Sequence, residues 1–273
     1  MAVEDEEKAK EILLDIGYYR LGFYWFPFEE TYPSLRERSH KFKHEASFKE
    51  TVDLYYLDTE IRNLIAPYIY RIEVNFRTFL IYTVSNYYEH KPTWFADSKI
   101  VNNKFLGVLQ NSYQNIKNNV AIANHHKKYP NDIYAPAWKT LEYMTFGDIL
   151  LLAQNLKDKT LQQHLADHYG IRNTKILWSW LCTIRVIRNL CAHGHNLYDL
   201  RLQKSLNAGF LKSKMPQCMR HDMRGVLIVV FYFLEHISAK RAEELKAKLR
   251  RILEEPRANA VNGAMKYLLD VLK

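Results

Sequence analysis

The sequence contains little cysteine, and its cysteines lack the spacing of a metal or disulfide site. The three residues, Cys182, Cys191 and Cys218, are odd in number and form no C-x-x-C pair. This usage argues against both a disulfide scaffold and a zinc knuckle. It fits a reducing compartment, and we expect a cytoplasmic protein.

Long hydrophobic runs are also missing. The longest unbroken apolar run covers residues 226–234, whereas a helix needs about 20 apolar residues to cross a bilayer. The N-terminus is acidic and lacks the basic and apolar order of a signal peptide. We therefore expect no membrane partner.

Glycine is scarce, with nine residues among 273, and few stretches alternate apolar with polar side chains. Apolar residues instead recur with a period near 3.6, which indicates helices. We predict an all-α fold, a helical bundle with additional N- and C-terminal helices. The expected parts are an N-terminal helix and basic aromatic segment in residues 1–46, a helical core in 47–200, and a C-terminal basic loop with helices packed on that core in 201–273.

Two residue pairs mark helix starts by their spacing. Ser47 and Glu50 have the capping-box spacing, so a helix should begin there and run to about Pro67. Thr145 and Asp148 have a similar spacing and predict a second start. Further periodic stretches predict helices over residues 4–16, 68–88, 98–124, 160–170, 224–237, 238–255 and 258–272.

The densest group of reactive side chains lies at the end of a predicted apolar helix. Asn173 and Thr174 offer N-cap chemistry for this helix, and Gly194 offers a stop. Between them one buried stripe is expected to contain Leu177, Trp180, Ile184, Ile187 and Cys191. Residues 184–199 then bring an arginine, an amide and two histidines together within a few positions.

Arg188 and His193 are the candidate pair of reactive side chains in this segment. They lie five positions apart, so on one straight helix their side chains would point roughly 140° apart, at about 100° per residue. A bend near Gly194, or a second copy of the chain, is therefore needed to bring both onto one ligand. Asn189 beside Arg188 is expected to point toward solvent.

Residues 188–193 (RNLCAH) resemble the R-x4-6-H signature of the HEPN superfamily of helical ribonucleases. Two further stretches, residues 71–78 (RIEVNFRT) and 141–148 (LEYMTFGD), resemble motifs of abortive-infection proteins of the AbiD/AbiF type, a branch of that superfamily. Residues 18–21 and 54–62 fit the same pattern, so the resemblance covers roughly residues 15–200. The chain departs from it after His193, where a second histidine is expected at once and an arginine soon after, but the sequence has Gly194, His195 and Asn196.

The resemblance implies a HEPN-like bundle and a metal-independent endoribonuclease that needs no cofactor. His193 would act as general base or acid, Arg188 would hold the scissile phosphate, and Asn189 would orient either group. The family builds its site from two copies, so a C2 homodimer is expected. The implied role is a toxin in phage defence, with RNA as substrate and a small noncoding RNA as a further partner that holds it in check.

Several other residues are candidates for support or for RNA contact. Supporting roles are expected for His195, Glu73, Arg77 and Tyr198. The net charge of +9 suggests a polyanionic partner, with RNA contacts expected from Arg36, Arg38, Lys41, Lys43, Lys127, Lys128, Lys212 and Lys214. A basic solvated surface explains the same residues equally well.

Two other functions stay open at this point. The first is a non-catalytic helical RNA-binding or adaptor protein that keeps the fold with a degenerate site. The second is a metal-dependent phosphohydrolase that would use His125, His126, His193 and His195, although the sequence has no carboxylate cluster spaced for a metal.

Overall fold

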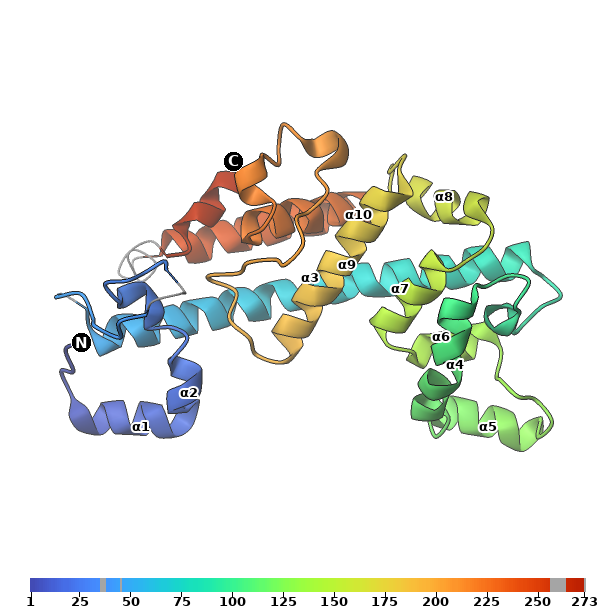
Figure 1. Ribbon diagram of the computed structural model, residues 1–273, viewed down its shortest axis with the longest axis horizontal. Helices are drawn as coiled ribbons and strands as arrows, with labels where there is room; N and C mark the ends of the chain where they lie inside the picture. Colours follow the sequence, from blue (N-terminus) through green and yellow to red (C-terminus); the bar gives the residue numbers. More distant parts are fainter. Residues whose placement is uncertain (35–37, 45, 256–263, 273) are drawn as a thin grey trace.

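The computed structural model describes residues 1–34, 38–44, 46–255 and 264–272. Within these ranges the regular structure is helical and no β-strand occurs, which confirms the all-α prediction. The molecule is elongated, and its long axis follows one helix, α3 (Phe48–Tyr87) (Figure 1). None of the helices in these ranges has an apolar stretch long enough to span a bilayer.

Helix α3 begins at the predicted capping box but does not end where the sequence suggested. The Ser47 side chain accepts from the Glu50 amide, and the Glu50 carboxylate accepts from the Ser47 amide. The predicted end near Pro67 is wrong, because the helix continues through Pro67 for 40 residues in all. Proline removes one hydrogen bond, but the helix is packed on both sides of it, with Ile65 and Ile69 fully buried.

Helix α9 (Thr174–Ala192) crosses α3 near its middle and carries the candidate site at its C-terminal end (Figure 1). Asn173 caps its N-terminus by accepting from the Lys175 amide at 2.9 Å, as predicted. Four members of the predicted stripe are fully buried, but Cys191 is only partly buried. The four buried members are Leu177, Trp180, Ile184 and Ile187.

Shorter helices surround the C-terminal half of α3. They are α4 (Asn103–Ile116), α5 (Val120–Lys128), α6 (Ala137–Tyr143), α7 (Phe146–Gln154) and α8 (Lys159–Asp167). The single helix expected over residues 98–124 is wrong, since the chain breaks between α4 and α5. Asn119 causes this break by accepting from the Ala121 amide at 3.1 Å, which caps a new helix. The start of α7 at Thr145 is confirmed.

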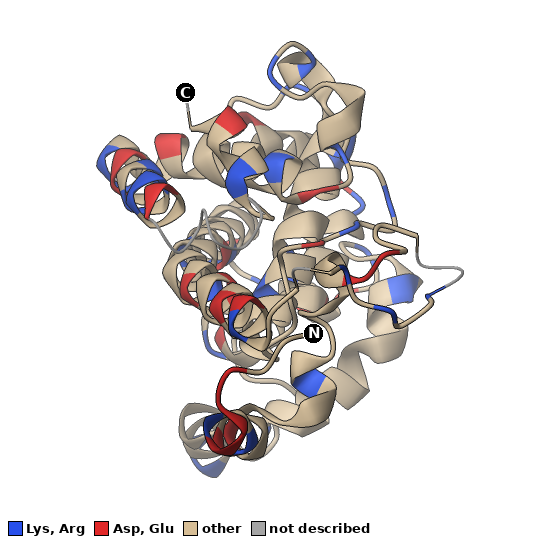
Figure 2. Ribbon diagram, turned by 90° about the vertical axis from the view of Figure 1, so that its left-hand side faces the viewer, with Lys and Arg blue, Asp and Glu red and all other residues tan. Residues whose placement is uncertain are grey.

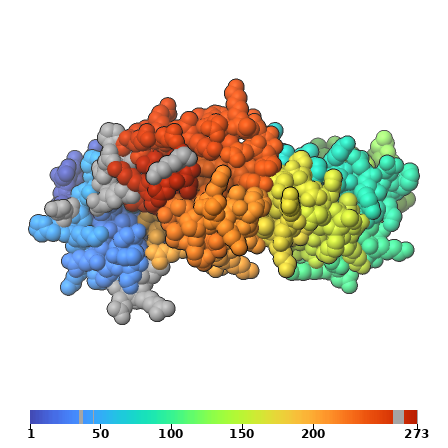
Figure 3. Space-filling model, turned by 90° about the horizontal axis from the view of Figure 1, so that it is seen from above, coloured from blue at the N-terminus to red at the C-terminus, as the bar shows by residue number. Residues whose placement is uncertain are grey.

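The C-terminal part packs along the N-terminal half of α3. Helix α10 (Met223–Glu254) is interrupted at Ser238, whose φ of −167° and ψ of 99° are non-helical, so the two helices expected over 224–237 and 238–255 meet at a kink. Of the helix expected over 258–272, residues 256–263 lie outside the described ranges. The short 3-10 helix η5 (Lys266–Val271) follows them. From above, this part covers the middle of the molecule (Figure 3).

The N-terminal part lies beside the start of α3. Helix α1 (Glu6–Ile16) ends at Gly17, whose φ of +90° allows the sharp turn into α2 (Tyr18–Leu21). Other single turns of 3-10 helix are η1 (Phe26–Phe28), η2 (Trp94–Ala96), η3 (Gly209–Leu211) and η4 (Gln217–Met219). The three-part division of the chain stays a prediction.

Candidate active site

A groove of about 590 Å³ runs beside the C-terminal half of α9. Three parts of the chain form it: α3, the connection from α6 to α7, and α9. Arg188 lies in its wall, with a side chain that is 41% exposed, so this residue is outside the core. The lining residues are Tyr70, Glu73, Val74, Arg77, residues 142–147, Arg185, Arg188 and Asn189.

A buried carboxylate fixes Arg188 in that wall. Glu73 of α3 accepts from the Arg188 Nε at 3.2 Å and from the Arg77 Nη2 at 2.9 Å. Arg77 Nη1 in turn donates to the backbone carbonyls of Leu141 and Met144, the latter at 2.8 Å. Glu73 is 3% exposed and Arg77 is 6% exposed, so their ion pair is buried. The structure thus brings together four of the predicted site residues, since Asn189 also lines the groove and accepts from the Arg188 Nη1 at 3.4 Å.

His193 is the C-cap residue, directly after the last residue of α9. Its φ of −97° and ψ of 5° already depart from helical values, and Gly194 after it adopts a left-handed φ of +68°. The His195 amide donates to the Leu190 carbonyl at 2.9 Å and the Gly194 amide to the Cys191 carbonyl at 3.3 Å, which together form a Schellman motif. The stop predicted at Gly194 is confirmed.

This geometry separates His193 from the Arg188 groove within one chain. Arg188 lines the groove, whereas His193, five residues later at the C-cap, does not. Both His193 and His195 are exposed, with ring centroids 6.5 Å apart. The helix end thus carries two solvent-exposed imidazoles outside the groove and an arginine in the groove wall.

Two residues of α3 hold the segment that follows the helix end. Asp58 is fully buried and accepts from the Leu197 amide at 2.9 Å and from the Tyr24 hydroxyl at 2.8 Å. Arg62 donates to the His195 carbonyl at 2.8 Å. The position of the histidine segment therefore depends on a buried polar cluster on a helix more than 100 residues earlier in the chain.

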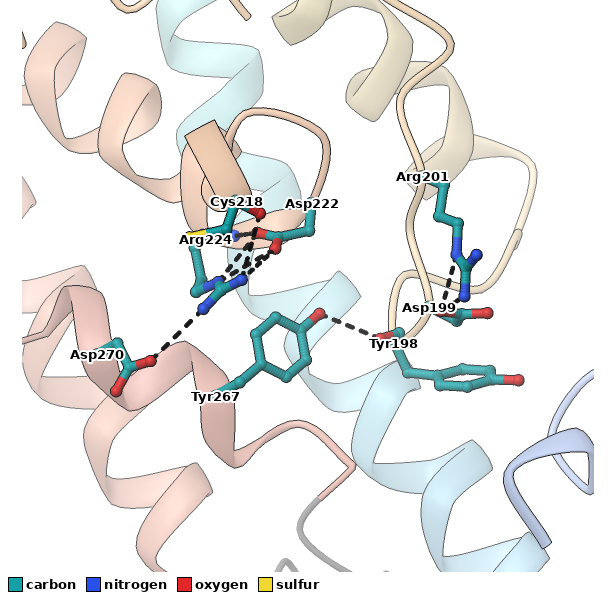
Figure 4. A network of polar contacts seen from close by, with 8 residues as sticks. All are labelled: Tyr198, Asp199, Arg201, Cys218, Asp222, Arg224, Tyr267 and Asp270. Atoms are coloured by element: carbon teal, nitrogen blue, oxygen red, sulfur yellow. Dashed lines mark hydrogen bonds and ion pairs between the residues drawn. The ribbon is translucent and has the colours of Figure 1, made fainter. Parts of the chain in front are cut away.

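Tyr198 belongs to this support and does not reach the groove. It is 4% exposed, and its hydroxyl donates to the Phe23 carbonyl at 2.5 Å. The Tyr267 hydroxyl donates to the Tyr198 carbonyl at 3.1 Å, which ties the C-terminal segment to the same loop (Figure 4).

In the same figure Arg224 lies between Asp222 and Asp270, joining the start of α10 to η5.

The Asp58 cluster gives the protein a specific pH dependence. Burial raises the pKa of the Asp58 carboxyl from 3.8 to about 6, and hydrogen bonds from Tyr24 and Leu197 and the charge of Arg62 offset part of this rise. Because the folded protein holds this proton more tightly than the unfolded chain, the contribution of Asp58 to stability is complete below pH 4. It is lost as the pH rises to about 6.

We expect the Asp58→Asn variant, which cannot titrate, to reveal this loss. The free energy of unfolding of the wild type relative to the variant should fall between pH 4 and pH 6 and stay constant above pH 7. The fall should reach up to roughly 3 kcal/mol, at about 1.4 kcal/mol per pKa unit. Urea unfolding of both proteins across this range measures it, and a difference that is constant or rises with pH would contradict the assignment.

Arg20 of α2 is a residue at this end of the molecule that sequence reasoning did not single out. Its guanidinium packs against Gly194, since its Nη1 lies 3.4 Å from the place where a Cβ of residue 194 would be. Arg20 is exposed, and its side chain makes no hydrogen bond or ion pair within the described ranges. The sequence did contain an indication of its importance, because Arg20 lies in residues 18–21, one of the segments that fit the family pattern. It adds a cation beside Gly194, the residue between His193 and His195 in the sequence.

The basic residues predicted to contact RNA do not gather on one surface. Lys41 and Lys43 lie near the N-terminus, Lys127 and Lys128 end α5 at the opposite end of the molecule, and Lys212 and Lys214 lie in the loop before α10 (Figure 1). Seen from the N-terminal end, acidic and basic residues are interspersed (Figure 2). Their RNA-binding role stays a prediction.

Within the basic N-terminal segment, protein groups already bind two of the residues predicted to contact RNA. Arg38 pairs with the fully buried Glu29, and its Cζ lies 4.6 Å from the centre of the Phe26 ring, so an internal partner occupies its charge. Lys43 likewise donates to the Pro27 carbonyl at 2.8 Å. Arg36 lies outside the described residues.

The four histidines of the metal alternative do not come together. The His125 Nε2 lies 2.9 Å from an Asp132 carboxylate oxygen, and the His126 Nε2 lies 2.6 Å from the Tyr113 hydroxyl. These residues belong to the α5 end of the molecule, away from His193. In the part of the chain that the structure describes, no group of three or more histidine, cysteine, aspartate or glutamate residues is arranged to hold a metal ion.

Comparison with protein families assigns the chain to a family. A family model described as Abi-like protein matches residues 11–199, more than half of the chain. The chain belongs to the Abi-like protein family. Membership indicates involvement in abortive infection, and the match in this Abi-like protein includes the Glu73 network and both residues of the Arg188 and His193 pair. Searches of curated proteins and of solved structures found no match.

Proposed function

We propose that this chain is a metal-independent endoribonuclease of the HEPN type, of the AbiD/AbiF branch, that acts as a toxin in abortive infection. The observation that carries the proposal is the end of α9. There Arg188 stands in a groove wall, fixed by buried Glu73, and His193 follows on the same helix with an exposed imidazole. A phosphate-binding cation and a proton-transfer group are what RNA transesterification requires.

The proposed reaction is attack of a ribose 2′-oxygen on the adjacent phosphorus. His193 accepts the proton of the 2′-hydroxyl as the new O–P bond forms, and the P–O5′ bond breaks. The second His193 of a dimer supplies the proton to the departing 5′-oxygen. Arg188 stabilises the charge that gathers on the non-bridging oxygens. The products are a 2′,3′-cyclic phosphate and a free 5′-hydroxyl, and Asn189 helps to orient the reacting groups.

Association of two chains completes this site. Within one chain Arg188 lines the groove and His193 does not. A twofold axis through this end places both copies of each residue around one phosphate, so we propose a C2 homodimer.

We expect cleavage to depend on protein concentration in the range where the dimer dissociates. Specific activity should fall in step with the dimer fraction, because a monomer holds only half of the site. Sedimentation at the assay concentrations measures the dimer fraction. A monomeric preparation with undiminished specific activity would refute the shared site.

The direct test of the proposed activity is cleavage of single-stranded RNA in the presence of EDTA. We expect fragments that end in a 2′,3′-cyclic phosphate, whereas a DNA strand of the same sequence stays intact because it lacks the nucleophile. Activity that requires added magnesium, or equal cleavage of the DNA strand, would contradict the proposal.

The second candidate is a non-catalytic RNA-binding protein with a degenerate site. The separation of His193 from the groove within one chain favours it, as does the departure from the family signature at Gly194. The basic residues outside the groove suit an RNA partner in either case, including a small noncoding RNA that restrains the toxin. Binding of RNA without any cleavage by the wild-type dimer would decide for this candidate.

A further inference from the structure

The groove beside Arg188 carries aromatic side chains that the proposed cleavage reaction does not use. Tyr70 of α3 is 58% exposed and Tyr143 at the end of α6 is 41% exposed, and both line the groove. They come from two different elements of its wall. Exposed tyrosine rings in a groove offer faces on which unpaired bases stack.

The same groove contains a cation whose side chain has no partner among the described residues. Arg185 lies one turn before Arg188 on α9 and is exposed, and its guanidinium makes no hydrogen bond or ion pair within those ranges. Its guanidinium lies over Gly147, with the Nη1 3.3 Å from where a Cβ of that residue would be, so a side chain there would crowd it. In contrast, Arg77 and Arg188 are both bound to Glu73.

The charges of the groove favour an anion at Arg185. Its lining contains three arginines, Arg77, Arg185 and Arg188, and two glutamates, Glu73 and Glu142, which leaves one positive charge. Because Glu73 is engaged by the two other arginines, Arg185 is the cation that remains for a ligand. A phosphate bound by Arg185 would lie one helical turn from Arg188.

We propose that this groove binds an unpaired nucleotide of the RNA substrate next to the scissile phosphate. Its base stacks on Tyr70 and Tyr143, and its phosphate binds Arg185. The inference rests on the proposed function, in which the neighbouring phosphate is held by Arg188. It also names the substrate class as single-stranded RNA, since a base within an A-form duplex cannot offer its faces to protein side chains.

Binding of an uncleavable single strand tests the proposal independently of catalysis. The probe is a fluorescein-labelled 12-nucleotide DNA strand, measured by fluorescence anisotropy with the full chain. We expect Tyr70→Ala and Tyr143→Ala each to weaken binding about 5- to 150-fold, and Tyr70→Phe and Tyr143→Phe to keep it, because stacking needs the ring and not the hydroxyl. Arg185→Ala should weaken binding and lower its salt dependence by about one phosphate contact.

Tyr82→Ala is the matched control. Tyr82 is also an exposed tyrosine of α3, at 67%, but it does not line this groove. The proposal is overturned if the Tyr70 and Tyr143 alanine variants bind like Tyr82→Ala, or if the phenylalanine variants lose as much affinity as the alanine ones. If binding depends on the two tyrosines but the protein cleaves no RNA, the proposed nuclease activity is wrong and the nucleotide site stands. If the protein cleaves RNA but its binding does not depend on the tyrosines, only the nucleotide site is wrong.

Discussion

Replacing His193 by alanine is expected to reduce RNA cleavage by about 10²- to 10⁴-fold while leaving the fold unchanged. Proton transfer by a positioned side chain contributes roughly that factor to a rate. The side chain of His193 is exposed, and the Schellman turn that follows it is made by backbone groups and by the left-handed Gly194, so the helix end does not depend on the imidazole. Single-turnover cleavage and thermal unfolding measure the two effects separately.

His90→Ala is the matched control for this variant. His90 is also an exposed histidine, it follows the C-terminal end of α3, and it has no hydrogen bond or ion pair in the described part of the chain. Toxicity in cells should be lost with His193→Ala and kept with His90→Ala, while RNA affinity stays the same in both. If cleavage and toxicity survive the loss of His193, the enzyme interpretation is wrong.

Replacing Glu73 by alanine is expected to cost about 3–5 kcal/mol of folding stability and to remove cleavage as well. The variant leaves Arg77, which is 6% exposed, buried without its carboxylate partner, and breaking a buried pair on one side typically costs this much. It also releases Arg188 from the groove wall, since Glu73 accepts from its Nε. Urea unfolding measures the stability, and cleavage assays well below the unfolding midpoint measure the activity.

Asp53→Ala is the control for the stability loss expected of Glu73→Ala. Asp53 also pairs with a basic residue four positions away on α3, but its partner Lys49 is 68% exposed, so the pair is worth only about 0.3–0.5 kcal/mol. Glu73→Gln separates the charge of Glu73 from its shape. The glutamine amide has the same shape and keeps one hydrogen-bond acceptor, but it carries no negative charge. A Glu73→Ala variant that is as stable as Asp53→Ala would show that the network does not support the groove.

The parts of the fold that depend on local sequence were predictable. The capping box at Ser47, the cap at Asn173 and the stop at Gly194 are each fixed by atoms within a few residues, and the structure has all three. The stripe on α9 follows equally from periodicity. Pro67 misled the prediction, because its effect on α3 depends on packing against helices distant in sequence.

The site was predictable only in part, for the same reason. Arg188 and His193 are visible as a spaced pair, but their support comes from Asp58 and Arg62, which lie more than 100 residues earlier. Residues 54–62 fit the family pattern, but no neighbouring residue in the sequence indicates that Asp58 accepts from the Leu197 amide. Arg20 could not be placed against Gly194 either, because no periodic pattern links two segments so far apart.

In the proposed reaction, a 2′-hydroxyl held at the end of α9 attacks the adjacent phosphorus of RNA. A DNA strand with random flanks and a single ribonucleotide tests this step directly, when it is incubated with the wild-type protein in EDTA and analysed by mass spectrometry. We predict one cut, directly 3′ of the ribonucleotide, with a 2′,3′-cyclic phosphate on the upstream fragment and no cut when that position carries a 2′-O-methyl group. No cleavage of the ribonucleotide strand, or cleavage of the methylated one, would contradict the account.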